Sequence, residues 1–284
     1  MPSPATESNI AIFRHFYAKY VAEGARQSKE RIRLAFAAVE RERFVGRGPW
    51  QVAVPGGYIS TDSDDPSLVY QDILIGLFAD KGINTGIPSL HARCLGEANP
   101  QPGDIVLQVG AGTGYYTAIL AKLVGLNGFV HAYELEQDLA QRAMVNLKDR
   151  KNVTIYSESA LTATLPTADI IYVCASVTHP PNVWLDALAI GGRMVLPLEP
   201  KERFGCMLLV TRHSQTAYAA GFFASASYIP CEGACDDSAS QALTAALESG
   251  NQDKVRSLRR NSYPDETAWC VGSDWWLSLA DCIY

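Results

Sequence analysis

The stretch VLQVGAGTGYYTAILA, residues 106–121, determines the fold class of this chain. An apolar run over residues 104–109 indicates a short buried strand. It leads into the glycine-rich sequence GAGTG, residues 110–114, and a helical pattern starts at Tyr116. Glycines at such a turn permit a tight bend and let a ligand lie against the backbone. The stretch therefore predicts a strand, a ligand-binding turn and a helix in succession.

Strand-like and helical segments alternate on the C-terminal side of this stretch. This alternation is typical of βαβ units with a parallel sheet. Two further strand-like runs are separated by a polar turn and indicate an antiparallel hairpin at the sheet edge. The sequence thus predicts an α/β fold with a Rossmann-like, doubly wound, mostly parallel sheet. The expected strands are 104–109, 128–133, 152–156, 169–174, 193–197, 206–212 and 218–229, and the expected helices are 116–124, 136–146 and 183–189.

The flanks of this core divide the chain into three expected segments. Residues 1–66 are expected to form N-terminal helices followed by a loop over 46–66, and residues 67–233 form the core. Residues 76–90 are loop-like and lead into a short helix that follows Pro88. Residues 234–284 form a C-terminal extension, helical over 236–262, with a tryptophan-rich hairpin over 267–279. This hairpin is expected to pack its aromatic side chains on the domain, and the alternative is an exposed patch for a partner.

Composition excludes several classes of protein. Apolar residues make up 48% of the chain and charged ones 19%, which is typical of a globular protein. The net charge of −6 disfavours a nucleic-acid partner. No apolar run reaches the 18 or more residues of a membrane helix, and the N-terminus lacks a secretory signal pattern. Seven cysteines without a C-x-x-C pair indicate reduced thiols, no zinc site and a cytoplasmic location.

The turn chemistry distinguishes between two nucleotide cofactors. A dinucleotide site needs a third glycine at position 115, which is Tyr115, so a nicotinamide-dependent oxidoreductase is disfavoured. Glu134 ends the next strand twenty residues after Gly114, where its carboxylate can bind both hydroxyls of a ribose. The pattern fits a nucleoside without phosphates, namely S-adenosylmethionine (SAM).

Residues 25–233 resemble the class I SAM-dependent methyltransferases, specifically the protein-L-isoaspartate O-methyltransferase group. The phrases AFAAVERERFVG (35–46), GINTGIPSLHA (82–92), GAGTGYYTAILA (110–121) and ADIIYVCASVTHPPNVWLDALAIGGRMVLPL (168–198) carry the likeness. The resemblance implies SAM as cofactor and S-adenosylhomocysteine as product. It implies that the cofactor is held by Gly110, Ala111, Gly112, Thr113, Gly114, Tyr115, Glu134, Leu135, Glu158, Ser159 and Ala160.

The methyl acceptor is expected near the carboxyl ends of the strands and beside the loop 82–91. Thr85 and His179 are the candidate catalytic residues. For His91 and His179, the alternative is a structural histidine that bonds to backbone. The candidate substrate-binding residues are Tyr70, Asn84, Thr85, Gly86, His91, Ser176 and His179.

Three positions depart from the family pattern. Gln108 replaces an acidic residue before the turn, Ser159 replaces the aspartate that contacts adenine, and Gly86 stands where the family has its active-site serine. We therefore expect O-methylation of a carboxylate on a peptide or small-molecule acceptor other than in isoaspartyl repair. The alternative is a non-catalytic scaffold or binding protein on the same fold. No nucleic-acid or membrane partner is expected, and a homodimer is left open.

Overall fold

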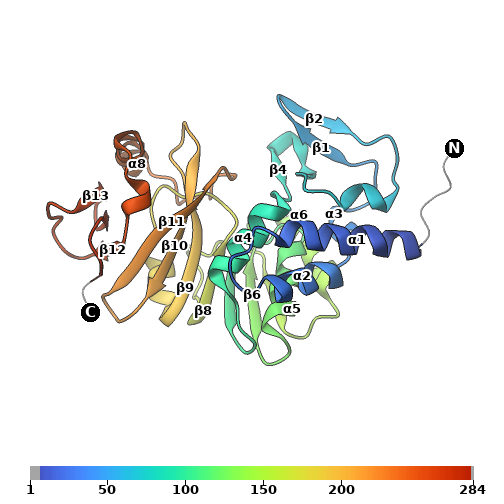
Figure 1. The fold of residues 1–284 in the computed structure, drawn as a ribbon, viewed down its shortest axis with the longest axis horizontal. Coiled ribbons are helices and arrows are strands. Elements are labelled where there is room, and N and C mark those ends of the chain that lie inside the picture. The colour runs from blue at the N-terminus through green and yellow to red at the C-terminus, as the bar shows by residue number, and fades with distance from the viewer. Residues whose placement is uncertain (1–6, 283–284) are drawn as a thin grey trace. The chain divides into compact units, whose positions relative to one another are not determined.

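The computed structural model describes residues 7–282 and divides into two compact units (Figure 1). The first unit contains the described part of Met1–Gly103 together with Ala111–Ser157. The second contains Asp104–Gly110 and Glu158 to the end of the described chain. The segment boundaries expected at residues 66 and 233 stay a prediction, and the start of the N-terminal stretch considered for a secretory signal lies outside the described residues.

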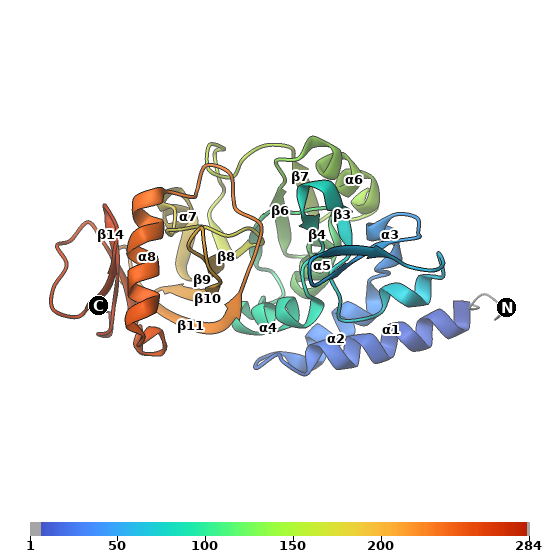
Figure 2. The same cartoon turned by 90° about the horizontal axis from the view of Figure 1, so that it is seen from above.

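Helices dominate the first unit, as the apolar periodicity predicts. The first two helices lie side by side (Figure 2). Buried Tyr17 of the first helix packs edge-on against buried Phe36 of the second, with ring centroids 6.0 Å apart, so their amphipathic faces meet in an aromatic core. The helices are α1 (Glu7–Ala22), α2 (Lys29–Ala38), α3 (Glu42–Val45), α4 (Pro88–Ala98), α5 (Tyr115–Val124) and α6 (Gln137–Leu147), with 3₁₀ turns η1 (Pro66–Val69) and η2 (Ala79–Lys81).

Three strand pairs belong to the described part of the first unit, and one of them lies where the sequence predicts strands. β6 (Phe129–Tyr133) and β7 (Val153–Tyr156) pair in parallel, as expected. The short strands β3 (Gly76–Phe78) and β4 (Ile83–Asn84) form an antiparallel pair within the expected loop 76–90.

The expectation of a loop over residues 46–66 is wrong for its central part. β1 (Gln51–Val54) and β2 (Gly57–Ser60) form a hairpin in which Val54 pairs with Gly57 across a two-residue turn, Pro55-Gly56. Pro55 and Gly56, two of the residues that indicated a loop, form the turn of this hairpin.

The second unit is a sheet of eight strands in the order β13-β14-β12-β11-β10-β9-β8-β5. β5 (Ile105–Val109), β8 (Ala168–Val173) and β9 (Leu188–Leu198) are parallel, and β10 (Gly205–Arg212) and β11 (Tyr218–Ala226) add the expected antiparallel hairpin. The α/β fold class is confirmed. β9 starts at Leu188, directly after the short helix α7 (Asn182–Ala187), rather than at residue 193.

The C-terminal extension continues this sheet instead of forming a separate layer. α8 (Asp237–Ser249) confirms the first half of the helix expected over 236–262, but the chain then passes η3 (Gln252–Lys254) and enters β12 (Ser257–Arg260), which pairs with β11. The expected tryptophan-rich hairpin is confirmed as β13 (Ala268–Val271) and β14 (Trp275–Ser278), and Trp275 and Trp276 are buried. The antiparallel part of the sheet is therefore larger than one hairpin.

No helix within residues 7–282 is long and apolar enough to cross a membrane. In the same part of the chain, no group of three His, Cys, Asp or Glu side chains is placed to hold a metal ion.

Candidate active site

The glycine turn before α5 adopts a backbone conformation that side chains rarely permit. Gly112 and Gly114 have φ angles of +56° and +94°, in the left-handed region that favours glycine. A Cβ atom at Gly114 would lie 2.6 Å from Leu147 Cδ1, so this glycine also allows α6 to approach the turn. The turn is thus fixed by its own glycines.

Glu134, directly after β6, is attached to this turn through its carboxylate. Its Oε2 accepts a hydrogen bond from the Gly112 amide at 2.6 Å, and its Oε1 accepts one from the Glu136 amide at 3.0 Å. Burial raises the pKa of the Glu134 carboxyl, and the two backbone amides oppose that shift. Each carboxylate oxygen keeps a second lone pair, so Glu134 can also accept two ribose hydroxyls. The residues present therefore fit a nucleoside cofactor.

Neighbouring side chains hold the rest of the turn. The Thr113 carbonyl accepts a hydrogen bond from the side-chain amide of Asn146 on α6 at 2.9 Å. The Tyr115 hydroxyl is hydrogen-bonded to the Tyr17 hydroxyl at 3.2 Å, and its ring packs against Phe44. The Tyr115 side chain belongs to the core, which leaves its backbone to contact a ligand. Ala111 is buried, and Leu135 is about half exposed.

Gly110 and Gln108 lie on the second unit. A Cβ at Gly110 would be 3.5 Å from Cys174, so the backbone of β5 passes close to the end of β8. Gln108 is fully buried; its side-chain nitrogen reaches Cys174 Sγ at 3.7 Å, while its Oε1 has no hydrogen-bond partner among the described residues. A buried acceptor without a donor costs about 1–3 kcal/mol.

The remaining cofactor candidates, Glu158, Ser159 and Ala160, also belong to the second unit. Ser159 Oγ accepts a hydrogen bond from the Leu161 amide at 3.2 Å, and the Ala160 carbonyl accepts one from the buried indole of Trp184 at 3.1 Å. Glu158 is exposed. Ser159 therefore shapes a turn, and its role toward a cofactor stays a prediction.

A fully buried arginine organises the acceptor side of the first unit. Arg41 Nη1 donates to the carbonyls of Val69 and Gln71 at 2.8 and 2.7 Å, and Nη2 donates to the carbonyl of Ile73 at 2.8 Å. Nη2 also reaches the hydroxyl of Thr85 at 3.3 Å. One side chain thus holds two parts of what we term the acceptor segment, residues 69–91.

Thr85 and Asn84 are committed to hydrogen bonds, most of them within this segment. Thr85 Oγ1 accepts from the Ile75 amide at 3.1 Å and donates to the Gly86 carbonyl at 3.2 Å. Asn84 Oδ1 accepts from the Gly86 amide at 2.9 Å, and its amide nitrogen lies 3.4 Å from the hydroxyl of Tyr58 on β2. Thr85 is 8% exposed, which makes it a poor proton acceptor for chemistry.

The His91 ring fills the space that a side chain at position 86 would occupy. Gly86 has φ +70°, and a Cβ there would lie 2.3 Å from His91 Nε2. The His91 ring stacks on Tyr116 with centroids 3.6 Å apart and is 2% exposed. Burial, assisted by the positive charge of Arg41, lowers the pKa of His91 to about 3, so the ring is neutral at pH 7. The imidazole therefore takes the room that a side chain at position 86 needs.

Tyr70 is buried, and its hydroxyl donates a hydrogen bond to Glu42 Oε2. Its pKa is raised by burial and by the Glu42 carboxylate. The tyrosine therefore keeps its proton and links α3 to the acceptor segment. Its direct contact with a substrate stays a prediction.

Ser176, Thr178 and His179 form a loop of the second unit. Ser176 Oγ donates to the Tyr228 carbonyl at 3.2 Å, and Thr178 Oγ1 accepts from the Asp236 amide at 2.8 Å and lies 3.3 Å from His179 Nδ1. Burial lowers the pKa of His179, while Asp236 and Asp274 act to raise it. His179 is thus a neutral, half-buried imidazole at pH 7, and its catalytic role stays a prediction.

Within the first unit, the structure brings Gly112 together with Glu134, and Thr85 together with Gly86 and His91. The sequence reasoning missed Arg41, Tyr58 and Asn146, which hold these two groups in place. Arg41 lies inside the family-like phrase 35–46, but nothing in a charge-rich helical pattern indicates that one of its arginines is fully buried.

Known proteins resemble this chain over most of its length. Residues 17–235 match the family model "Protein-L-isoaspartate(D-aspartate) O-methyltransferase (PCMT)". A protein-L-isoaspartate O-methyltransferase of Ignicoccus hospitalis is 35% identical over 136 residues, 46% of this chain and 64% of that protein. One of Pyrobaculum arsenaticum is 30% identical over 191 residues, 66% of this chain and 83% of that protein.

Solved structures agree with the fold. A structure titled protein-L-isoaspartate O-methyltransferase aligns with a TM-score of 0.65 at 20% identity, covering 93% of this chain and 87% of that one. A Plasmodium falciparum structure, titled as a putative enzyme of this type in complex with S-adenosyl-L-homocysteine, aligns at 0.61 and 19% identity, covering 76% and 97%. The match spans less than two thirds of the Ignicoccus hospitalis relative and 47% of one from Aeropyrum pernix. With its glycine turn, carboxylate and matched family model, the chain belongs to the protein-L-isoaspartate O-methyltransferase family of class I SAM-dependent methyltransferases.

Proposed function

We propose that this protein transfers a methyl group from SAM to a carboxylate oxygen of a peptide or small-molecule acceptor, in the cytoplasm. The observation that carries the proposal is the Glu134 carboxylate bonded to the Gly112 amide at the glycine turn. Bound there, SAM supplies an electrophilic methyl group on a sulfonium. Glu134 holds the ribose, and the glycines of the turn let the cofactor lie against the backbone.

The state of the acceptor segment supports a carboxylate as the nucleophile. A carboxylate is ionised at pH 7 and attacks without a base, whereas a hydroxyl or an ammonium group needs one. In the first unit, the Thr85 hydroxyl is already hydrogen-bonded to the Ile75 amide and the Gly86 carbonyl. His91 is buried, and its pKa is about 3. Neither residue is a good base, so their part is to shape the surface beside the acceptor. Transfer then depends on alignment of the two reactants, which can be worth an effective molarity of about 10⁵ M or more.

The identity of the acceptor is the finer part of the proposal. The names of the relatives make an isoaspartyl carboxylate the first acceptor to test. The departure at Gly86, together with the space taken by His91, favours an acceptor held differently from the family pattern. That acceptor stays a prediction, and the homodimer stays open.

The test is methyl transfer from labelled SAM to three acceptors: an isoaspartyl peptide, its aspartyl counterpart and a mixture of small carboxylic acids. We expect ester formation that is abolished in Glu134→Ala. Glu136→Ala is the matched control, because Glu136 is the neighbouring carboxylate, pairs with Lys81 at 2.8 Å on the surface and should leave turnover unchanged. Binding of S-adenosylhomocysteine without ester formation on any acceptor would favour the non-catalytic alternative.

A further inference from the structure

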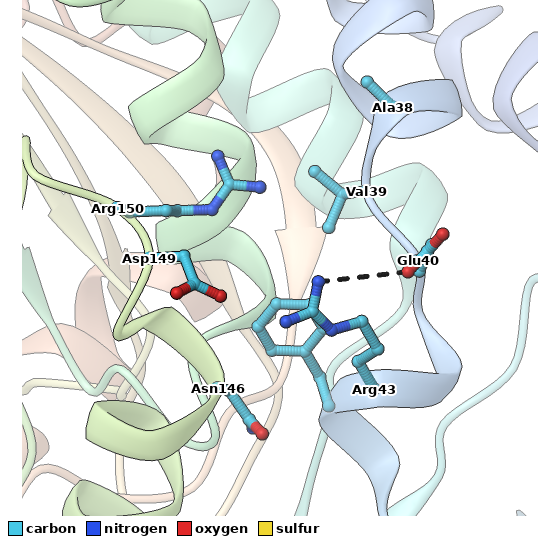
Figure 3. A pocket seen from close by; sticks show the side chains of 8 residues that line it. Ala38, Val39, Glu40, Arg43, Asn146, Asp149 and Arg150 are labelled. Carbon is cyan, nitrogen blue, oxygen red and sulfur yellow. Dashed lines mark ion pairs between the residues drawn. The ribbon is translucent and has the colours of Figure 1, made fainter.

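A cavity of about 340 Å³ lies in the first unit between the α2–α3 junction and the C-terminal end of α6 (Figure 3). Its wall has an apolar part and a polar part. The apolar part is formed by Ala38, Val39 and Phe44, and the polar part by Glu40, Arg43, Asn146, Asp149 and Arg150. Its volume falls in the range of about 300–1,000 Å³ that is typical of small-molecule sites. None of the predicted cofactor or acceptor residues lines it.

Arg150 carries a charge without a partner in this cavity. The side chain is half-buried, and its guanidinium makes no hydrogen bond or ion pair with any residue in the described part of the chain. Burial and the positive charge of Arg43 both lower the pKa of Arg150. A guanidinium removed from water without an anion is unfavourable, so this corner of the cavity is suited to a negative group.

The acidic side chains that line the cavity leave this charge uncompensated. Glu40 is shared between Arg14 at 3.4 Å and Arg43 at 3.9 Å. Asp149 is exposed and forms no ion pair within residues 7–282. Figure 3 shows the Arg43 and Arg150 side chains entering from different elements, Arg43 from α3 and Arg150 from the chain that follows α6.

We propose that this cavity binds a small organic molecule with one phosphate or carboxylate group and an apolar body. The anionic group would lie between the Arg43 and Arg150 guanidiniums, whose donor geometry matches such oxyanions. The apolar body packs on Val39 and Phe44. Two residues of the cavity wall also support the glycine turn: the Phe44 ring is 5.6 Å from that of Tyr115, and the Asn146 side chain donates to the Thr113 carbonyl at 2.9 Å.

The test is calorimetric titration of the protein, without SAM, with phenyl phosphate at constant ionic strength. Two control ligands are titrated in the same way. Inorganic phosphate measures binding of the anionic group without the ring, and phenol measures binding of the ring without the phosphate. We expect phenyl phosphate to bind most tightly, and Arg150→Gln to weaken it about tenfold or more, because a hydrogen bond to a charged group is lost. Lys148→Gln makes the same change of charge on an exposed neighbour outside the cavity and should leave the affinity unchanged.

Folding does not complicate this comparison. Because the Arg150 side chain has no partner within residues 7–282, Arg150→Gln should unfold at the same temperature as the wild type or higher. The proposal is overturned if wild type and Arg150→Gln bind phenyl phosphate equally, or if Lys148→Gln loses as much affinity. Phenol binding as tightly as phenyl phosphate would also overturn it. The titration uses neither SAM nor an acceptor, so its result is independent of the proposed methyl transfer.

Discussion

The glycine turn and the acceptor segment of the same unit are held in opposite ways. In the turn, the special backbone angles of Gly112 and Gly114 belong to the glycines themselves, and Glu134 meets the Gly112 amide directly. In the acceptor segment, the conformation depends on Arg41, which lies 28 to 44 residues before its partners in the sequence. The conformation of the glycine turn is therefore local and can be predicted from a motif, whereas that of the acceptor segment depends on contacts that form only when the chain folds.

Replacing Arg41 should give the largest effect. Arg41→Met leaves the carbonyls of Val69, Gln71 and Ile73 without their donor, and a buried carbonyl without a donor costs about 1–3 kcal/mol, so the three together should cost about 3 kcal/mol or more. Urea unfolding should report a loss of that size. Arg43→Met, a half-exposed neighbour, should change stability by no more than about 0.5 kcal/mol. Equal effects of the two substitutions would show that the acceptor segment does not depend on Arg41.

Placing a serine at position 86 should be the next most damaging change. Gly86→Ser adds left-handed strain and a clash with His91, which together cost about 2–4 kcal/mol of stability. Removing the imidazole in Gly86→Ser/His91→Ala should restore the stability lost to the clash but not the stability lost to the backbone strain. A double-mutant cycle measured by urea unfolding tests this coupling, and strictly additive effects of the two substitutions contradict it.

His91 should make stability depend on pH. Its pKa is about 3 in the folded chain and about 6.5 when unfolded, so the unfolded state binds the proton more tightly. The stability from the neutral ring is present above pH 6.5 and is lost as pH falls toward 3. Between pH 7 and pH 5 the loss from this group is about 2 kcal/mol. His91→Phe keeps the stack on Tyr116 and should remove that part of the pH dependence; an unchanged profile would refute the assignment.

The smallest loss of stability is expected for a substitution in the glycine turn, Gly112→Ala. A Cβ at Gly112 has only Leu77 Cδ1 near it, at 3.5 Å, so Gly112→Ala meets left-handed strain alone and should cost about 1 kcal/mol. Gly114→Ala adds a contact of 2.6 Å with Leu147 and should cost more. Thermal unfolding of the two variants tests the order, and a larger loss for Gly112→Ala would reverse this account of the turn.

Several elements followed directly from the sequence. The strand at 105–109, the glycine turn, the helix after it and Glu134 at the end of β6 are all where the pattern predicted them. Each depends on contacts between residues near in sequence, on period-dependent burial or on glycine's own backbone freedom. The helix that starts at Pro88 is of the same kind, because proline is preorganised for a first helical position.

Other elements depended on the folded environment. β1 and β2 are four-residue strands joined by Pro55-Gly56, and their sequences, QVAV and GYIS, show no regular alternation of apolar and polar residues that would indicate them. β12 was expected to be helical, but it lies between β11 and β14 and pairs with both, so tertiary pairing overrides local propensity.

The sequence by itself determined the α/β fold, the cofactor turn and its carboxylate, because those features rest on local backbone chemistry. Only the tertiary structure decided that Arg41 is buried, that His91 fills the space of a side chain at position 86, and that Arg150 faces a cavity with no partner among the described residues. Burial and charge compensation depend on which distant segments pack together, and a linear pattern does not contain that information.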